Sequence, residues 1–313
     1  MVGVLNGFAV IVALVALGWL LARSRVLGTD ARLVLNRLVF FVATPALLFD
    51  ALARTTLDQV FTGVFVVSAG TALVMALAYV LIAKVWLRRP AADLAVGALA
   101  ASYVNSANLG IPIAVYVLGD FGFVMPLLLF QVAVLQPVAI AVLERTARTE
   151  GTTDGRGGAF ASALQAARTP LVLAALAGVV VAALPWTPPD PLLEPVHLVG
   201  QISVPGALLV FGMSLYGVKV LEAGASPRRE IWLASVLKLV AHPLLAYAIG
   251  SGLMGMRGHE LLTVVVAAAL PTAQNVLVVA TRYGHATLLA RDSAVLTTLG
   301  ALPVLLLVSA LLA

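Results

Sequence analysis

In this 313-residue chain, two long apolar runs are each interrupted by a cluster of uncharged polar residues together with proline or glycine. The first cluster consists of Asn105, Ser106, Asn108, Gly110 and Pro112, and the second consists of Pro271, Thr272, Gln274 and Asn275. Proline removes a backbone donor and disfavours helix just before it, so both runs are predicted to be broken helices. A broken helix exposes amide groups and a partial positive charge at its new N-terminus, which suits a carboxylate. The sequence therefore predicts an anion site lined by amides, although Asn and Pro that merely pack and kink helices would give the same pattern.

A second set of residues places ionisable groups inside apolar segments. Lys238 and His242 lie four residues apart and hence on one face of the segment 230–254, near its middle. They are interpreted either as a tether that holds the second broken helix by its backbone carbonyls or as a proton-linked coupling pair. Asp50, close to Arg54, is a third residue considered for coupling or tethering, with an interfacial position as its alternative.

Gln131 and Gln136, beside Pro137, are the last polar residues with a predicted role. They are predicted to line a cavity, and hydrogen bonding between helices is an equally good explanation. No metal site or cofactor is expected, because cysteine is absent and the four histidines show no metal-ligand spacing.

The composition restricts the class of protein that can carry these residues. Apolar residues make up 62% of the chain and charged residues 11%, against about 45–50% and about 25% in soluble domains. An ordinary cytosolic enzyme, a disordered protein and a nucleic-acid binder are therefore excluded. A membrane enzyme is also not expected, since no His-Glu-x-x-His occurs and FGMSLYG at 211–217 departs from Gly-x-Ser-x-Gly spacing.

The apolar runs are long enough to cross a bilayer, for which roughly 20 residues are needed. The expected architecture is an all-α polytopic membrane protein with ten transmembrane helices, the fourth and ninth of them broken. The predicted spans are residues 4–22, 33–53, 59–83, 92–119, 121–143, 169–186, 195–217, 230–254, 260–281 and 289–312. Fifteen of the 19 Lys and Arg residues lie in the odd-numbered connections or, for Arg291, at the edge of one. By the positive-inside rule these connections face the cytoplasm, so a plasma-membrane protein with both termini extracytoplasmic is expected.

The chain is predicted to be an inverted repeat of two five-span halves. Residues 1–143 form the first repeat, residues 144–168 a cytoplasmic linker and residues 169–313 the second repeat. An odd number of spans per half gives the halves opposite orientations, and Thr44-Pro45-Ala46-Leu47-Leu48 resembles Val204-Pro205-Gly206-Ala207-Leu208 at the corresponding place. Inverted repeats of this kind are a transporter architecture in which substrate binds near the midplane, between the repeats.

Three stretches of the sequence resemble the auxin efflux carrier family, which includes PIN-type carriers and bacterial permeases resembling malonate or malate transporters. They are NSANLGIP at 105–112, ALPTAQNVLVVATRYG at 269–284 followed by SAVLTTLGALPVLLL at 293–307, and VLKLVAHPLL at 236–245. The resemblance implies a fold with two crossed broken helices, usually dimeric, that moves small organic anions. It also implies a substrate-binding role for Asn105 and helix-breaking roles for Pro112 and Pro271.

The predicted function is a secondary transporter of a small organic anion, such as malonate, malate or an indole acid, with alternating access around the two helix breaks. The predicted substrate-binding residues are Asn105, Ser106, Asn108, Thr272, Gln274 and Asn275, and the predicted helix-break residues are Gly110, Pro112 and Pro271. The alternative is a sodium- or proton-coupled symporter of the bile-acid/sodium symporter type. A channel and a membrane sensor are the weaker alternatives, since no filter motif is visible. The expected partners are the substrate, the lipid bilayer and a second copy of the chain.

Overall fold

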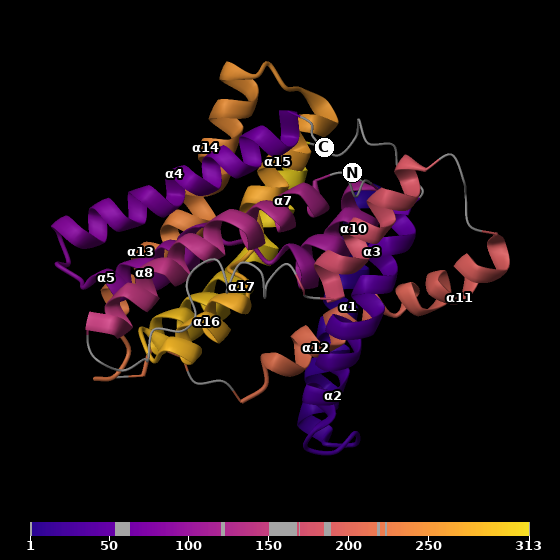
Figure 1. Ribbon diagram of the computed structural model, residues 1–313, viewed down its shortest axis with the longest axis horizontal. Coiled ribbons are helices and arrows are strands. Elements are labelled where there is room, and N and C mark those ends of the chain that lie inside the picture. The colour runs from indigo at the N-terminus through magenta and orange to yellow at the C-terminus, as the bar shows by residue number, and fades with distance from the viewer. Residues whose placement is uncertain are drawn as a thin grey trace. The chain divides into compact units, whose positions relative to one another are not determined.

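The computed structural model describes residues 2–53, 63–119, 123–149, 168, 170–184, 189–217, 220–222 and 224–312, and its regular elements are helices (Figure 1). Within these ranges there is no strand, only an isolated antiparallel bridge between Val104 and Thr272. Six helical runs are long and apolar enough to cross a membrane: Ala31–Ala53, Gly63–Val85, Pro126–Ala147, Asp190–Ser214, Arg228–Leu253 and Thr287–Leu312. The chain is therefore an all-helical polytopic membrane protein. Each of the ten predicted spans contains helix, while membrane crossing by the shorter ones stays a prediction.

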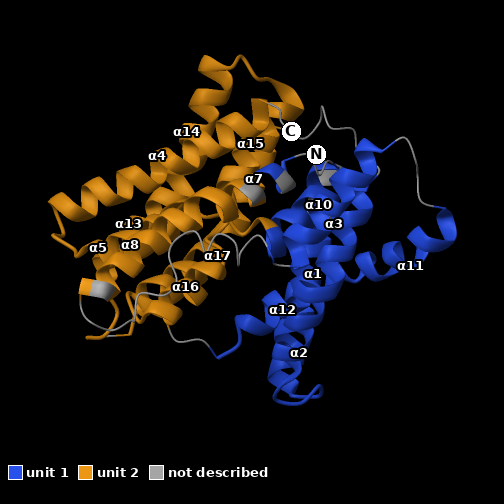
Figure 2. Cartoon of the chain, viewed as in Figure 1, with its two compact units in different colours: residues 1–62, 107–126, 167–218 blue, residues 63–106, 127–166, 219–313 orange. Residues whose placement is uncertain are grey.

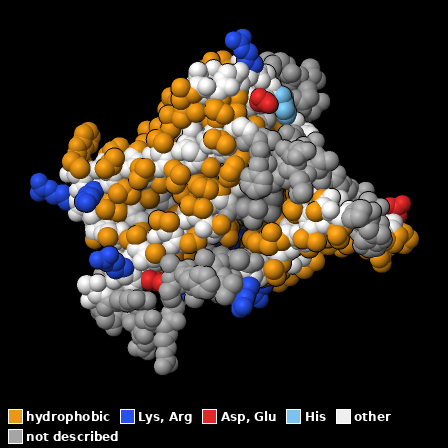
Figure 3. Space-filling view, turned by 45° about the horizontal axis from the view of Figure 1, so that its top comes forward, with side chains coloured by type: hydrophobic (Ala, Val, Ile, Leu, Met, Phe, Trp, Pro, Cys, Tyr) orange, Lys and Arg blue, Asp and Glu red, His pale blue; other side chains and the backbone are white. Residues whose placement is uncertain are grey.

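The surface has the apolar character that a lipid environment requires. Along helix α4 (Gly63–Val85), Leu73, Leu77 and Leu81 are exposed at intervals of four residues, whereas Met75 and Tyr79 are buried. Figure 3 shows apolar side chains over much of the described surface in its view. A helix that is apolar on its exposed side as well as on its buried side is typical of a membrane span.

The helices form two compact units that interleave along the chain (Figure 2). Unit 1 takes residues 1–62, 107–126 and 167–218, and unit 2 takes residues 63–106, 127–166 and 219–313. Each unit thus draws on both sides of the predicted linker, so the compact units are not the two predicted repeats. The predicted linker 144–168 begins as helix, because α8 (Gln136–Thr149) continues to Thr149, and residues 150–167 lie outside the described part.

Unit 1 is built around two pairs of packed helices. Its elements are α1 (Val2–Ser24), α2 (Ala31–Leu38), η1 (Val39–Ala43), α3 (Thr44–Ala53), α6 (Ile111–Ile113), η4 (Ala114–Leu118), α10 (Pro170–Ala183), α11 (Asp190–Gln201) and α12 (Ser203–Ser214). Helices α1 and α12 pack together, as do α3 and α10. At Gly212 a Cβ atom would lie 2.0 Å from the carbonyl oxygen of Val15, so only glycine allows α12 to approach α1 this closely.

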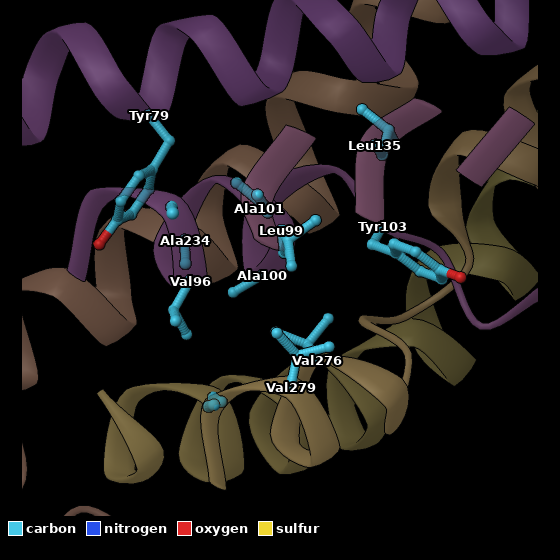
Figure 4. Close-up of a cluster of buried hydrophobic side chains, with 14 of the residues drawn as sticks. Tyr79, Val96, Leu99, Ala100, Ala101, Tyr103, Leu135, Ala234, Val276 and Val279 are labelled. Carbon is cyan, nitrogen blue, oxygen red and sulfur yellow. The ribbon is translucent and has the colours of Figure 1, made fainter. Parts of the chain in front are cut away.

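Unit 2 surrounds the short helix α5 (Ala91–Ser102). Its other elements are α4, η5 (Gln131–Leu135), α8, α13 (Arg228–Val236), η6 (Leu237–Ala241), α14 (His242–Ala248), η7 (Ile249–Leu253), α15 (Gly258–Ala269), α16 (Asn275–Tyr283) and α17 (Thr287–Leu312). Helix α5 contacts α4 and α16, and Figure 4 shows Val96 and Leu99 directed toward Val276 and Val279. Buried apolar side chains on several faces fix α5 in place, which positions the backbone that follows it.

Four prolines are accommodated inside helices by a local widening of the turn. Pro45, Pro112, Pro137 and Pro243 each stand two residues after a five-residue π-helical turn, namely η1, η3 (Ser106–Gly110), η5 and η6. Proline cannot donate to the carbonyl four residues earlier, and its ring clashes with that carbonyl. A π-turn, in which the donor lies five residues after the acceptor, relieves both problems, so the helices continue.

This accommodation corrects the predicted position of the first helix break. Gly110 has helical backbone angles (φ −63°, ψ −44°) and is followed by Pro112 within α6, so neither residue interrupts the helix. The chain is helical from Ser106 to Leu118. The interruption lies earlier, between the end of α5 at Ser102 and the start of η3 at Ser106. Pro271 lies in the second interruption, between α15 and α16.

Candidate functional site

The two helix interruptions of unit 2 pair with each other as short extended segments. The amide of Asn105 donates to the carbonyl of Pro271 over 2.8 Å, and the amide of Ala273 donates to the carbonyl of Tyr103 over 3.1 Å. Val104 and Thr272 lie opposite each other between these two bonds. Residues 103–105 and 271–274, called the crossing from here on, thus form an antiparallel contact between segments that are far apart in sequence.

The amides of the crossing that point outward are each satisfied by one side chain. The amide of Val104 donates to Oε1 of Gln131 over 2.5 Å, and the amide of Thr272 donates to Oγ1 of Thr297 over 3.1 Å. Gln131 and Thr297 are both buried. Non-helical backbone at membrane depth is tolerated only when its polar groups find partners within the protein, and these two side chains supply them.

Further side-chain bonds tie the crossing to the helices that it interrupts. The hydroxyl of Thr272 donates to the carbonyl of Ala100, in the last turn of α5, over 2.6 Å. Nε2 of Gln131 donates to Oγ of Ser106 over 3.0 Å, at the start of η3. The last carbonyls of a helix have no partner within it, so Thr272 satisfies a group that the break leaves open.

The predicted binding side chains of unit 2 differ in their exposure. Asn105, Ser106 and Thr272 are buried at the crossing, Gln274 is half-buried and Asn275 is exposed at the first turn of α16. Asn275 is therefore the accessible amide, and it stands at the positive end of a helix. Residues 94–119 and 261–281 contain no charged side chain. The accessible polar side chains of the crossing and of the first turn of α16, Gln274 and Asn275, are thus neutral donors and acceptors.

Tyr103 is a residue of this site that sequence analysis did not single out. Its hydroxyl donates to Oε1 of Gln136 over 3.3 Å and also shares a side-chain hydrogen bond with Asn275. Figure 4 shows the hydroxyl of Tyr103 at the edge of the buried cluster. Tyr103 thereby links α8, the crossing and the start of α16. The only signal in the sequence was its place two residues before the polar cluster.

Lys238 and His242 form a buried polar cluster at the end of α15. Nζ of Lys238 lies 2.9 Å from Nδ1 of His242 and donates to the carbonyl of Ala268 over 3.1 Å. Nε2 of His242 lies 3.2 Å from the hydroxyl of Thr71 on α4. Lys238 is fully buried and its amine contacts the helix that ends at the second interruption, which is the contact that a tether would need.

Asp50 belongs to unit 1 and pairs there with a histidine. Oδ2 of Asp50 lies 2.7 Å from Nδ1 of His197 on α11, and Nε2 of His197 lies 2.8 Å from Nε2 of Gln201. The predicted neighbour Arg54 lies outside the described residues. Asp50 thus joins α3 to α11, a pairing that the sequence did not indicate.

The remaining predicted residues are Asn108, Gly110 and Pro112. They lie after the crossing, in the helical stretch Ser106–Leu118, and belong to unit 1, which includes residues 107–126. Among the described residues, no group of three or more His, Asp and Glu side chains could hold a metal ion. The arrangement of unit 2 is therefore a polar crossing with a buried amine beside it, set in apolar helices.

Comparison with known proteins shows the family to which the chain belongs. The chain matches the membrane transport protein family over residues 4–151 and 159–309. It belongs to that family, the auxin efflux carrier family. It is also 30% identical, over 273 residues, to a protein of Rhizobium meliloti (strain 1021) named "Putative malonate transporter". That alignment covers 87% of this chain and 84% of the relative. The family resemblance of the sequence is thus confirmed.

Proposed function

We propose that this family member is a secondary carrier of a small organic carboxylate and that its substrate site is built on the crossing of unit 2. Membership of a membrane transport family supports the carrier class. The name of the Rhizobium meliloti relative makes malonate the first substrate to try. The observation that carries the proposal is the pairing of two helix interruptions whose accessible side chains, Gln274 and Asn275, are uncharged.

The chemistry of the crossing favours an anion that is recognised by hydrogen bonds. The backbone amides of Val104 and Thr272 are already satisfied by side chains, so the groups left to meet a substrate are side-chain amides and the first turn of α16. Amide donors at a positive helix end attract carboxylate oxygens without a fixed counter-charge. A solute held in this way can leave readily, because no buried ion pair has to be broken.

The transport mechanism proposed is alternating access between two bodies, of the elevator kind. The two compact units would be these bodies, since each is packed as a unit of its own. An inverted repeat is part of the proposal. Gln131 follows the first interruption and Thr297 follows the second, and each satisfies one outward amide of the crossing. The predicted spans 121–143 and 289–312, the last of each half, would then both serve to satisfy an amide of the crossing. A homodimer and extracytoplasmic termini complete the proposed arrangement.

Malonate counterflow in proteoliposomes tests the proposal. Vesicles loaded with unlabelled malonate should accumulate labelled malonate faster than empty ones, because a carrier, unlike a channel, is accelerated by substrate on the far side. Asn275→Ala should weaken malonate binding about tenfold or more, since a hydrogen bond to a charged group is worth about 1.5–3 kcal/mol. Asn36→Ala on α2, within unit 1, is the matched control and should transport normally.

The direction and driving force of malonate transport can be measured in the same vesicles. Moving one negative charge out of an inside-negative vesicle gains about 2.3 kcal/mol per 100 mV. Malonate efflux should therefore accelerate when a potassium diffusion potential makes the vesicle interior negative. Flux that shows neither counterflow nor a response to potential would contradict the proposed carrier.

A further inference from the structure

The buried amine of Lys238 has two acceptors that can be assigned from its neighbours. The hydroxyl of Thr71 donates to the carbonyl of Ser68 over 3.2 Å, so its oxygen must accept a hydrogen bond from Nε2 of His242. This assignment makes Nδ1 of His242 an acceptor, because a neutral imidazole carries one hydrogen. The amine of Lys238 therefore donates to Nδ1 of His242 and to the carbonyl of Ala268.

No acidic side chain of the described residues forms an ion pair with Lys238. Asp292, on the neighbouring helix α17, is fully buried but accepts hydrogen bonds from the amide of Leu221, the hydroxyl of Ser226 and Nε of Arg291. Glu230, on α13, pairs instead with Arg89. The partners of Lys238 are thus a carbonyl and an imidazole nitrogen, which is unusual because buried ammonium groups normally pair with carboxylates.

The position of the amine explains this choice of partners. Ala268 is the penultimate residue of α15, and the chain turns away from helix at Leu270 to enter the crossing. The C-terminal end of a helix carries a partial negative charge on its unpaired carbonyls. In transporters with broken helices, such carbonyl-bearing ends are where coupling cations bind. In this chain the amine of Lys238 lies against such an end, at the carbonyl of Ala268.

We infer that the side chain of Lys238 is a built-in replacement for a bound alkali-metal ion at the end of α15. Transport by this chain is then independent of Na⁺, a consequence that rests on the proposed carrier function. Lys238, His242 and Thr71 together occupy the volume and the carbonyl oxygen that an ion would need. The sodium-coupled alternative is thereby disfavoured by the same contacts that hold the second interruption.

Thermal melting of the purified full-length protein tests the cation site without requiring transport. The wild-type protein should melt at the same temperature in NaCl, KCl and choline chloride at equal ionic strength and pH. Lys238→Ser opens the space next to the carbonyl of Ala268 and adds an oxygen ligand. This variant should melt lower than the wild type in choline chloride. Sodium should then raise its melting temperature by about 3–5 °C when present at about ten times its Kd.

Lys238→Met is the matched control, because methionine fills much of the same volume but leaves no room for an ion and offers it no oxygen. Its melting temperature should be the same in the three salts. A saturable increase in the melting temperature of the wild type with Na⁺ would overturn the inference. Salt-independent melting of Lys238→Ser would overturn it as well.

Malonate counterflow tests the consequence of this inference for transport, namely independence of Na⁺. Malonate counterflow by the wild type should proceed at the same rate in NaCl and in choline chloride, and a Na⁺ requirement would refute Na⁺ independence. Absence of malonate counterflow in either salt would count against the proposed function, while the melting data would still decide whether Lys238 replaces an ion.

Discussion

Thr297→Val isolates one hydrogen bond of the crossing. Valine has nearly the shape of threonine and a similar helix propensity, so the packing of α17 is preserved. The substitution removes the acceptor of the Thr272 amide, which lies in a buried position. A buried donor left without a partner costs about 1–3 kcal/mol. The hydroxyl of Thr297 also donates to the carbonyl of Ser293 over 2.7 Å, but that carbonyl can still accept the helical amide bond.

Thr298→Val is the control, since Thr298 is the adjacent residue and its hydroxyl makes no hydrogen bond to any described residue. Thr297→Val should lower the melting temperature by about 2–6 °C, while Thr298→Val should change stability by less than about 0.5 kcal/mol. Amide hydrogen exchange should speed up in the peptide that contains Thr272 and nowhere else near α17. If both variants melt and exchange like the wild type, the crossing is not held as described.

Three further substitutions test other contacts of unit 2. Gln131→Met keeps the length of the side chain and removes the acceptor of the other outward amide, so it should lower stability by about 1–3 kcal/mol in a thermal melt. Gly97→Ala should destabilise by about 1–3 kcal/mol or prevent expression, because its Cβ would lie 2.0 Å from the ring of Tyr79. Gly70→Ala is its control, has no neighbour within 4 Å and should be neutral or stabilising. Asp292→Ala removes the acceptor that holds residues 221 and 226 to α17, and limited proteolysis should then cut this connection faster than in the wild type.

The sequence was a good guide to the helices because bilayer thickness fixes how long an apolar run must be. Each predicted span contains helix, and both polar clusters lie at or next to a helix interruption. The first interruption was misplaced because Pro112 follows a π-turn instead of ending the helix. Whether a proline breaks or only widens a helix depends on packing around it, which a single sequence does not contain.

The side chains that complete the site were harder to predict. Gln131 was expected to line a cavity or to bond between helices, and it is used to satisfy the amide of Val104. Thr297 was not singled out, because a threonine in an apolar helix becomes informative only once its partner is known. For Lys238 the tether interpretation now has a carbonyl partner at Ala268, and its role in transport stays a prediction. The pairing of Asp50 with His197 joins residues far apart in sequence that no spacing rule connects.

The interleaving of the two units has a consequence for how the protein is made. Unit 1 has all of its segments once residue 218 has been synthesised, whereas unit 2 needs the rest of the chain. Until α15 and α16 have been synthesised, residues 103–105 lack the paired segment 271–274 that accepts and donates their backbone hydrogen bonds. Newly made chains are therefore expected to carry an unpaired polar stretch for the time that translation takes, and a chain truncated before residue 271 should be a preferred target of membrane quality-control proteases.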